Sequence, residues 1–245
     1  MANWSDPRSS TARFGAAQAG TRDAAYDAGL RSYMLSVYNY MTSGVLLTGI
    51  VALGFALSGY AAAVFQTPLR WVIVLAPLAF VFAMSFGQNR FSSGQLRAMF
   101  WGFAVAMGLS LSTIFLVYSP VAIAQAFFAT AAGFAALSLY GYTTKRDLSA
   151  FGTFLIIGLV GLIVASLINM FVNSGPLGLL ISLVGVLLFA GLTAYDTQRT
   201  KSMYFQVAGH GELVSKAVVL AALTLYLDFI NMFLFILRLF GSGRD

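Results

Sequence analysis

Two aspartates, Asp196 and Asp228, lie within apolar runs of the chain where acidic side chains are rare. Asp196 stands in the run GLTAYDTQ, and Asp228 stands in the run LTLYLDFIN. The chain has eight acidic residues, and the other six fall in its terminal or loop regions: Asp6, Asp23, Asp27, Asp147, Glu212 and Asp245. A carboxylate inside a membrane costs at least about 2.5 kcal/mol on insertion scales, so such residues usually pair, line water, or move ions and protons. Asp196 and Asp228 are therefore the first candidates for a functional site.

The two aspartates fall in the last two apolar segments of the chain, which we expect to run antiparallel. Both carboxyl groups can then reach the same half of a helix bundle. Two carboxyl groups that share a low-dielectric site do not both ionise readily, and they titrate as one unit. We therefore predict a pH-responsive pair at Asp196 and Asp228. The alternative is a hydrogen-bonded pair that only ties two helices together.

Asp228 belongs to a stripe of small and polar residues on one face of the last predicted helix. The members recur at helical spacing: Ala217, Ala221, Thr224, Asp228 and Asn231. Such a stripe is typical of a helix that approaches its neighbours closely, and packing is enough to explain the alanines. Packing does not explain Asp228 with Asn231, because neutral residues would pack without the desolvation cost.

The oxygen atoms expected near the pair are of the kind that binds cations. Calcium takes about six to eight oxygen ligands, and Asn231, Thr193 and Thr224 can join the two carboxylates, backbone carbonyls and water. This set predicts transient calcium binding at Asp196 and Asp228 without a high-affinity cage. A leak pathway needs such weak binding, because the ion must be able to leave. Protons or monovalent cations fit the same residues, and no resident cofactor is expected.

The composition indicates a polytopic membrane protein. The 245 residues are 59% hydrophobic and 9% charged, with a mean hydropathy of +0.84. In a soluble domain about a quarter of the residues are charged. Cysteine is absent, which excludes disulfides and thiolate chemistry.

Seven apolar segments are each near the roughly 20 residues that a helix needs to cross a bilayer. They run over residues 36–58, 71–86, 99–118, 121–142, 151–172, 177–195 and 214–240. Helices are expected because all backbone polar groups must be satisfied within the segment. The sequence therefore predicts an all-α membrane protein with seven transmembrane helices in residues 31–241. A disordered cytoplasmic tail is predicted over residues 1–30 and a short C-terminal tail over residues 242–245.

The basic residues are distributed unevenly over the predicted loops. If the N-terminus is inside, eleven of the fourteen Lys and Arg residues lie inside, and only Arg70, Arg238 and Arg244 lie outside. This asymmetry predicts a cytoplasmic N-terminus, and it explains the net charge of +6 without a nucleic-acid partner. The two C-terminal arginines leave a re-entrant last segment as an alternative. The first 30 residues have no apolar run and contain acids, which argues against a signal or transit peptide.

The residues around both aspartates resemble the two C-terminal signatures of the Bax inhibitor-1 family, also called the transmembrane BAX inhibitor motif family. These residues are AYDTQ at 194–198 and LYLDFINMFLFILRLFG at 225–241. The segment RSYMLSVYNYMTSGVLLTGIVA at 31–52 is similar to the first helix of the bacterial members. The resemblance covers residues 25–241.

The resemblance implies a seven-helix fold in which the C-terminal helix runs through the centre of the other six. It also implies a pH-sensitive calcium leak of the bacterial inner membrane, governed by an aspartate pair that corresponds to Asp196 and Asp228. The family has a basic residue near the inner end of the second helix, and Arg90 is its expected counterpart. Arg90 would latch the helices to a carboxylate, or it would serve only as a topology signal. A long link at residues 197–213 departs from the shorter bacterial members.

Two other functions compete with an ion leak. One is a modulator that docks on another integral membrane protein, such as a quality-control protease, as is reported for bacterial relatives. The other is an intramembrane aspartyl protease, whose first aspartate often lies in a Tyr-Asp pair like Tyr195-Asp196. The second protease motif has glycines three and one positions before its aspartate, where this chain has Leu225 and Leu227. We therefore do not expect an enzyme.

Overall fold

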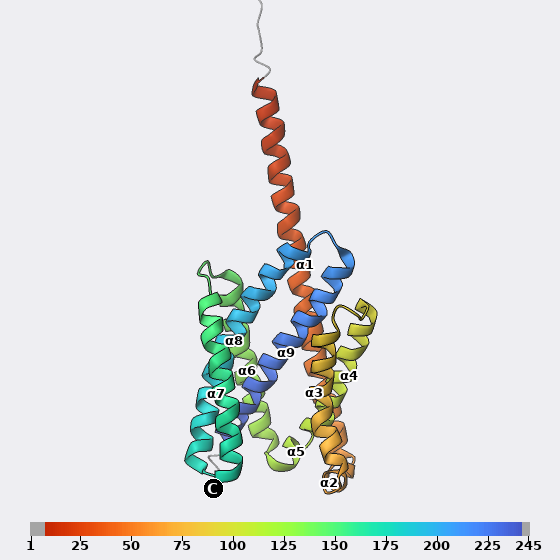
Figure 1. Ribbon diagram of the computed structural model, residues 1–245, viewed down its shortest axis with the longest axis vertical. Helices are drawn as coiled ribbons and strands as arrows, with labels where there is room; N and C mark the ends of the chain where they lie inside the picture. The colour runs from red at the N-terminus through yellow and green to blue at the C-terminus, as the bar shows by residue number, and fades with distance from the viewer. Residues whose placement is uncertain (1–7, 242–245) are drawn as a thin grey trace, which may run out of the picture.

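The computed structural model describes residues 8–241, and it describes side chains for residues 27–241. All regular structure in this part of the chain is helical (Figure 1). The helices are α1 (Arg8–Leu57), α2 (Tyr60–Phe65), α3 (Leu69–Gly87), α4 (Ser93–Leu111), α5 (Ile114–Val117), α6 (Pro120–Thr143), α7 (Ser149–Val172), α8 (Gly175–Val207) and α9 (Gly211–Gly241).

Seven of the described helical stretches are long and apolar enough to cross a membrane, which confirms the predicted fold class. They are Asp27–Leu57, Leu69–Gly87, Ser93–Val117, Pro120–Thr143, Ser149–Val172, Gly175–Val207 and Gly211–Gly241. The third span joins α4 to the short helix α5, and α2 lies in the link between the first two spans. α9 is one unbroken helix of 31 residues, unlike the re-entrant segment considered as an alternative.

α9 lies between two groups of three helices. It packs against α1 and α4 on one side and against α6 and α8 on the other, while α3 packs on α4 and α7 packs on α8 (Figure 1). Of the seven spans, α9 has the largest buried share. The resemblance predicts α9 at the centre of the other six helices, and in the structure it packs mainly against these four.

A buried hydroxyl chain fixes α9 to α1 and α4. The hydroxyl groups of Tyr226 and Thr48 lie 2.7 Å apart, and Thr48 donates to the carbonyl oxygen of Ala104 at 2.8 Å. The ring of Tyr226 also packs edge-on against Phe103, with 5.0 Å between the ring centroids. These hydrogen bonds satisfy the two hydroxyl groups that α1 and α9 bring into the apolar core.

The start of α9 also holds the start of α4. Glu212 accepts a hydrogen bond from the backbone nitrogen of Ser93 at 2.9 Å and another from its hydroxyl at 3.1 Å. Ser92 and Gln95 add a reciprocal capping box at the same helix end. These bonds satisfy amide groups that a helix N-terminus leaves unpaired. Glu212, which looks like a loop acid in the sequence, therefore joins two helices.

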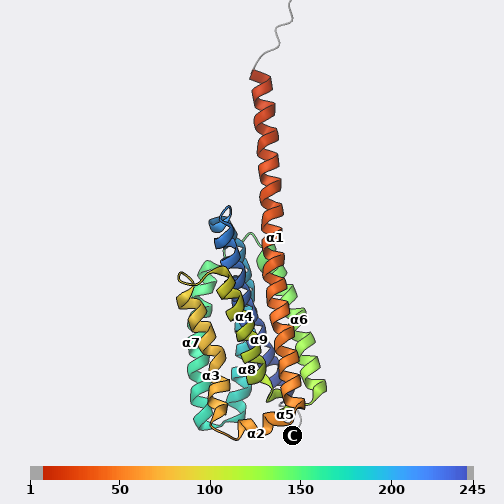
Figure 2. The same cartoon turned by 90° about the vertical axis from the view of Figure 1, so that its right-hand side faces the viewer.

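The first helix begins well before the bundle. Residues 8–30 continue α1 as helix, where the sequence predicts a disordered tail. This stretch is rich in alanine, the strongest helix former. Figures 1 and 2 show it projecting beyond the other helices. Residues 1–7 and 242–245, which include the predicted C-terminal tail, lie outside the described residues.

The predicted link at residues 197–213 is mostly helix. α8 continues to Val207, and the turn to α9 consists of residues 208–210 with Gly209 at φ 89°. Arg199 and Lys201 mark the place where the sequence stops being apolar. An α-helix satisfies its own backbone outside the hydrocarbon as well, so a loss of hydrophobicity does not end it.

Candidate functional site

The two aspartates meet between α8 and α9, as the sequence predicts. Their carboxyl groups lie within hydrogen-bonding reach of each other, and the side chains are only 9% (Asp196) and 4% (Asp228) exposed. The Oδ2 atom of Asp228 is buried and accepts no hydrogen bond from any donor in the described part of the chain. The neighbouring carboxyl group can donate only when it carries a proton. A proton shared by the two carboxyl groups would satisfy this oxygen.

The pair lines a cavity of about 680 Å³ between α7, α8 and α9. Besides the aspartates, its polar lining includes Arg199, Thr224 and Asn231, and most of the remaining wall is apolar. Within the described residues no cluster of three or more His, Asp or Glu side chains forms. The cavity therefore offers two carboxylates to a cation but lacks the further acidic ligands of a tight metal site.

Arg199 is the basic residue at this site, and Arg90 is not. Arg199 follows Asp196 by three positions on α8, and its charge acts on the Asp196 carboxylate. Arg90 is exposed in the turn between α3 and α4, and it is absent from the residues that line the cavity. Arg90 therefore lies away from the pair, as a topology signal would, and Arg199 is the basic residue that lines the cavity. The sequence held a signal for it, because residues three apart on a helix are neighbours.

The three supporting residues differ in their positions. Asn231 lines the cavity and donates its amide hydrogen to the carbonyl oxygen of Leu227 at 2.8 Å, so its own oxygen is the group that it can offer to a cation. Thr224 lines the cavity with its hydroxyl bonded to its own helix. Thr193 is fully buried, donates to the carbonyl oxygen of Phe189 and is absent from the cavity lining.

Two glycines allow α8 to pass closely between α6 and α7 at the level of Asp196. A Cβ atom at Gly141 of α6 would overlap the carbonyl oxygen of Ala194. A Cβ atom at Gly152 of α7 would overlap the ring of Tyr195. Ala194 and Tyr195 are the two residues before Asp196 in the chain. Small residues at such crossings let helix backbones approach, so both contacts hold α8 next to Asp196.

Polar side chains of α8 then hold the link between α6 and α7. Gln198 donates to the carbonyl oxygen of Arg146 at 2.8 Å and accepts from the backbone nitrogen of Leu148 at 2.9 Å. Lys201 donates to the carbonyl oxygen of Tyr142 at 2.8 Å. The helical extension of α8 therefore anchors this link beside the site.

Two further cavities adjoin the aspartate cavity along α7 and α8. One of about 530 Å³ shares Ser166 with it and is lined by Asn169, Asn173 and Arg238 near the C-terminal end of α9. The other, of about 310 Å³, shares Tyr195 and Arg199 with it and lies against the link between α6 and α7. The aspartates thus occupy the middle of three successive cavities.

The fold and this site define a class of protein: an integral membrane protein with seven apolar helices and a buried aspartate pair. The family model described as "Inhibitor of apoptosis-promoting Bax1" matches residues 30–245, so the chain belongs to the Bax inhibitor-1 family.

Three bacterial relatives show the extent of the similarity. An uncharacterized protein of Rickettsia prowazekii is 45% identical over 92% of this chain and 95% of its own length. The inner membrane protein YbhL of Escherichia coli is 44% identical over 89% of this chain and 94% of its own length. An uncharacterized protein of Caulobacter vibrioides is 40% identical over 91% of this chain and 93% of its own length.

Proposed function

We propose that this protein is a pH-sensitive cation leak, with calcium as the favoured ion and with Asp196 and Asp228 as its sensor. The observation that carries the proposal is the buried carboxyl pair in the wall of a cavity, with one oxygen that has no donor among the described residues. A change of pH alters the number of protons on this pair. It therefore alters both the charge in the cavity and the bond between α8 and α9.

The same groups provide a weak cation site. When the pair is ionised, the two carboxylates, the Asn231 oxygen and the Thr224 hydroxyl present oxygen atoms to one cavity. Arg199 holds a positive charge in the same wall at every relevant pH, which opposes tight binding of a cation. Weak binding suits conduction, because the ion must leave as readily as it enters.

The three successive cavities supply the route. An ion that enters beside Asn169 and Asn173 passes Ser166 to reach the aspartates. It then passes Tyr195 and Arg199 to reach the link between α6 and α7. We assign the gating movements to these shared residues, because each lines the cavities on both of its sides.

We place the N-terminus in the cytoplasm and the protein in the inner membrane. The bundle end that carries the turns at residues 88–92, 144–148 and 208–210 is called here the basic end. It holds Arg31, Arg90, Arg97, Lys145, Arg146, Arg199, Lys201 and Lys216, whereas Arg70 and Arg238 lie toward the opposite end. Short loops rich in Lys and Arg stay in the cytoplasm. The relative YbhL is named an inner membrane protein, which supports the same membrane.

Flux through purified protein in liposomes tests the proposal. Wild-type protein should release calcium to an internal dye at a rate that depends on pH. Each of Asp196→Asn and Asp228→Asn should flatten that dependence between about pH 5 and 8, where a coupled carboxyl pair titrates. Asp27→Asn is the control, because Asp27 is an exposed acid at the start of the first span and lines none of the three cavities. Wild-type pH profiles in both aspartate variants would refute the sensor.

The same preparation separates a leak from the rival functions. We assign no catalytic step to the pair, so wild-type protein should cleave no model transmembrane substrate. Cleavage that disappears in Asp228→Ala would overturn the proposal in favour of a protease. Absence of calcium, sodium, potassium and proton flux at every pH would favour a modulator of another membrane protein.

A further inference from the structure

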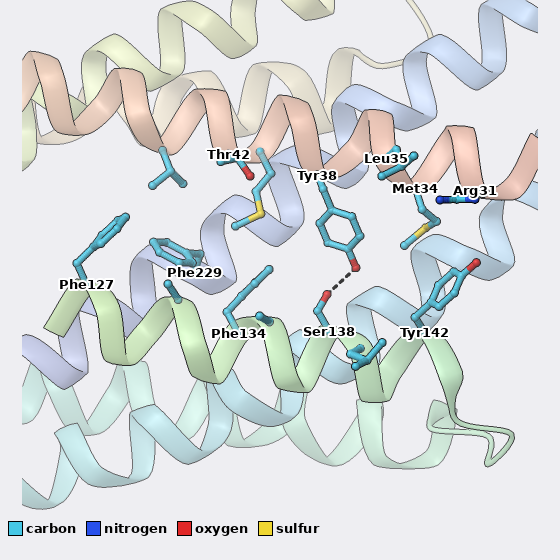
Figure 3. A pocket seen from close by; sticks show the side chains of 15 residues that line it. Arg31, Met34, Leu35, Tyr38, Thr42, Phe127, Phe134, Ser138, Tyr142 and Phe229 are labelled. Atoms are coloured by element: carbon cyan, nitrogen blue, oxygen red, sulfur yellow. Dashed lines mark hydrogen bonds between the residues drawn. The ribbon is translucent and has the colours of Figure 1, made fainter. Parts of the chain in front are cut away.

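Another cavity, on the other side of α6 from the aspartates, lies between α1 and α6. It measures about 680 Å³ and is lined mainly by apolar side chains of these two helices, with Phe229 of α9 as its floor (Figure 3). Three of its lining residues are exposed: Leu35 is 53% exposed, Phe127 is 40% exposed and Leu139 is 64% exposed. The cavity is therefore a groove that opens on the surface facing lipid.

The groove continues toward the opposite end of the bundle. An adjoining cavity of about 420 Å³ shares Val45, Phe127 and Phe229 with it and reaches Leu53 and Pro120. From Arg31 to Leu53 of α1 the length is roughly 33 Å at 1.5 Å per residue, which is close to the thickness of the hydrocarbon core. The α1–α6 seam is thus hollow over much of the membrane.

One hydrogen bond crosses the groove and limits what can lie in it. The hydroxyl groups of Tyr38 on α1 and Ser138 on α6 lie 2.6 Å apart (Figure 3). A helix with side chains is about 10 Å wide, so a helix of a second copy or another protein would have to break this bond to enter. A single acyl chain is narrow enough to lie in the groove and pass over the bond without breaking it.

A positive charge lies at the basic end of this groove. Arg31 lines the groove beside Tyr142, and Lys201 stacks its ammonium group on the Tyr142 ring at 5.0 Å from the centroid. Asp27 lies one turn before Arg31 on α1 and is the nearest acidic residue to it in the sequence. A guanidinium group binds phosphate through two parallel hydrogen bonds, and tyrosine is typical of the headgroup level of a membrane.

From this combination we infer that the groove binds one acyl chain of an anionic phospholipid, with its phosphate group at Arg31. The apolar walls take the chain, and the charge at the mouth selects the headgroup. Arg31 lies at the end of the bundle where polar headgroups meet the first span, so both parts of one lipid molecule can be bound together. This site is separate from the aspartate cavity and does not depend on ion conduction.

Photo-crosslinking of the full chain in nanodiscs tests this site. Phosphatidylglycerol and phosphatidylcholine, each with a diazirine on one acyl chain, are compared at equal amounts, and labelled peptides are mapped by mass spectrometry. Phosphatidylglycerol should label residues 34–45 and 127–139 about fivefold more than phosphatidylcholine, the ratio expected for one arginine at a membrane surface. Arg31→Gln should abolish this preference. Arg97→Gln, an exposed arginine of α4 at the basic end, should keep it.

A groove-filling variant provides an independent check. Thr42 lines the groove and is exposed, so Thr42→Trp should fill it and reduce labelling there by either lipid without unfolding the bundle. Ile157→Trp, on the lipid-facing surface of α7, should leave the labelling unchanged.

Three results would overturn the inference. Equal labelling by both phospholipids in the wild type would mean that only unselective boundary lipid lies in the groove. Labelling by a diazirine fatty acid that matches phosphatidylglycerol would mean that the phosphate group is not recognised. Cross-links from a photoreactive amino acid at Thr42 to a second protein chain would mean that protein covers the groove.

Discussion

The crossing of α6 and α8 at Gly141 provides the sharpest structural test of how Asp196 is positioned. In Gly141→Ala the new methyl group would overlap the carbonyl oxygen of Ala194. This obstacle is backbone within a helix, so it cannot rotate away as a side chain would. Overpacking of this kind costs about 1–3 kcal/mol. The helices must separate by a small amount, and Asp196 moves with α8.

Gly133 is a matched control on the same helix. It lies eight residues before Gly141, and a Cβ atom there meets no other atom within 4 Å. Gly133→Ala therefore adds a methyl group in open space, and it should gain about 0.5–1 kcal/mol from the better helix propensity of alanine. The two variants differ only in whether α8 stands in the way.

Thermal unfolding in detergent measures both variants. With a shift of roughly 2–4 °C per kcal/mol for a chain of this size, Gly141→Ala should lower Tm by several degrees, whereas Gly133→Ala should not lower it. In liposomes only Gly141→Ala should also alter the pH response, because Ala194 lies two positions before Asp196. Equal or higher stability of Gly141→Ala relative to Gly133→Ala would refute the close crossing.

Three further predictions follow from single contacts. Arg199→Gln should shift the pH midpoint of the flux upward, because the counter-charge beside Asp196 is lost. Arg90→Gln should leave the midpoint unchanged. Measuring flux at several pH values distinguishes the two variants. Tyr226→Phe should lower the unfolding free energy by about 0.6–1 kcal/mol, measured by denaturation in detergent, because one buried hydrogen bond is lost. Glu212→Gln should weaken the junction of α4 and α9, seen as faster amide hydrogen exchange at residues 93–96.

The sequence predicts the seven spans and the aspartate pair because both follow from strong local constraints. A span needs about 20 apolar residues, and that length is visible without any knowledge of packing. Acids are so costly in hydrocarbon that the two on consecutive spans are expected to meet. Asp196 and Asp228 therefore come together in the structure as the pattern indicates.

The partner of the pair is harder to predict, because it depends on which helices are neighbours. Arg90 follows the second span, and that span packs on α4, away from α8. Arg199 lies on the same helix as Asp196, but it stands in a polar stretch that hydropathy assigns to a loop. Once α8 is seen to continue to Val207, Arg199 falls one turn from Asp196 and on the same face.

The contacts of the pair also bear on the choice between a sensor and a structural tie. A pair that only joined α8 to α9 could use an amide, which carries its own donor and satisfies a neighbouring oxygen at every pH. The described structure instead leaves Oδ2 of Asp228 buried with no protein donor, next to a second carboxyl group. Such an oxygen is costly unless a donor is present. A shared proton would supply that donor, and the proposed sensor rests on this arrangement.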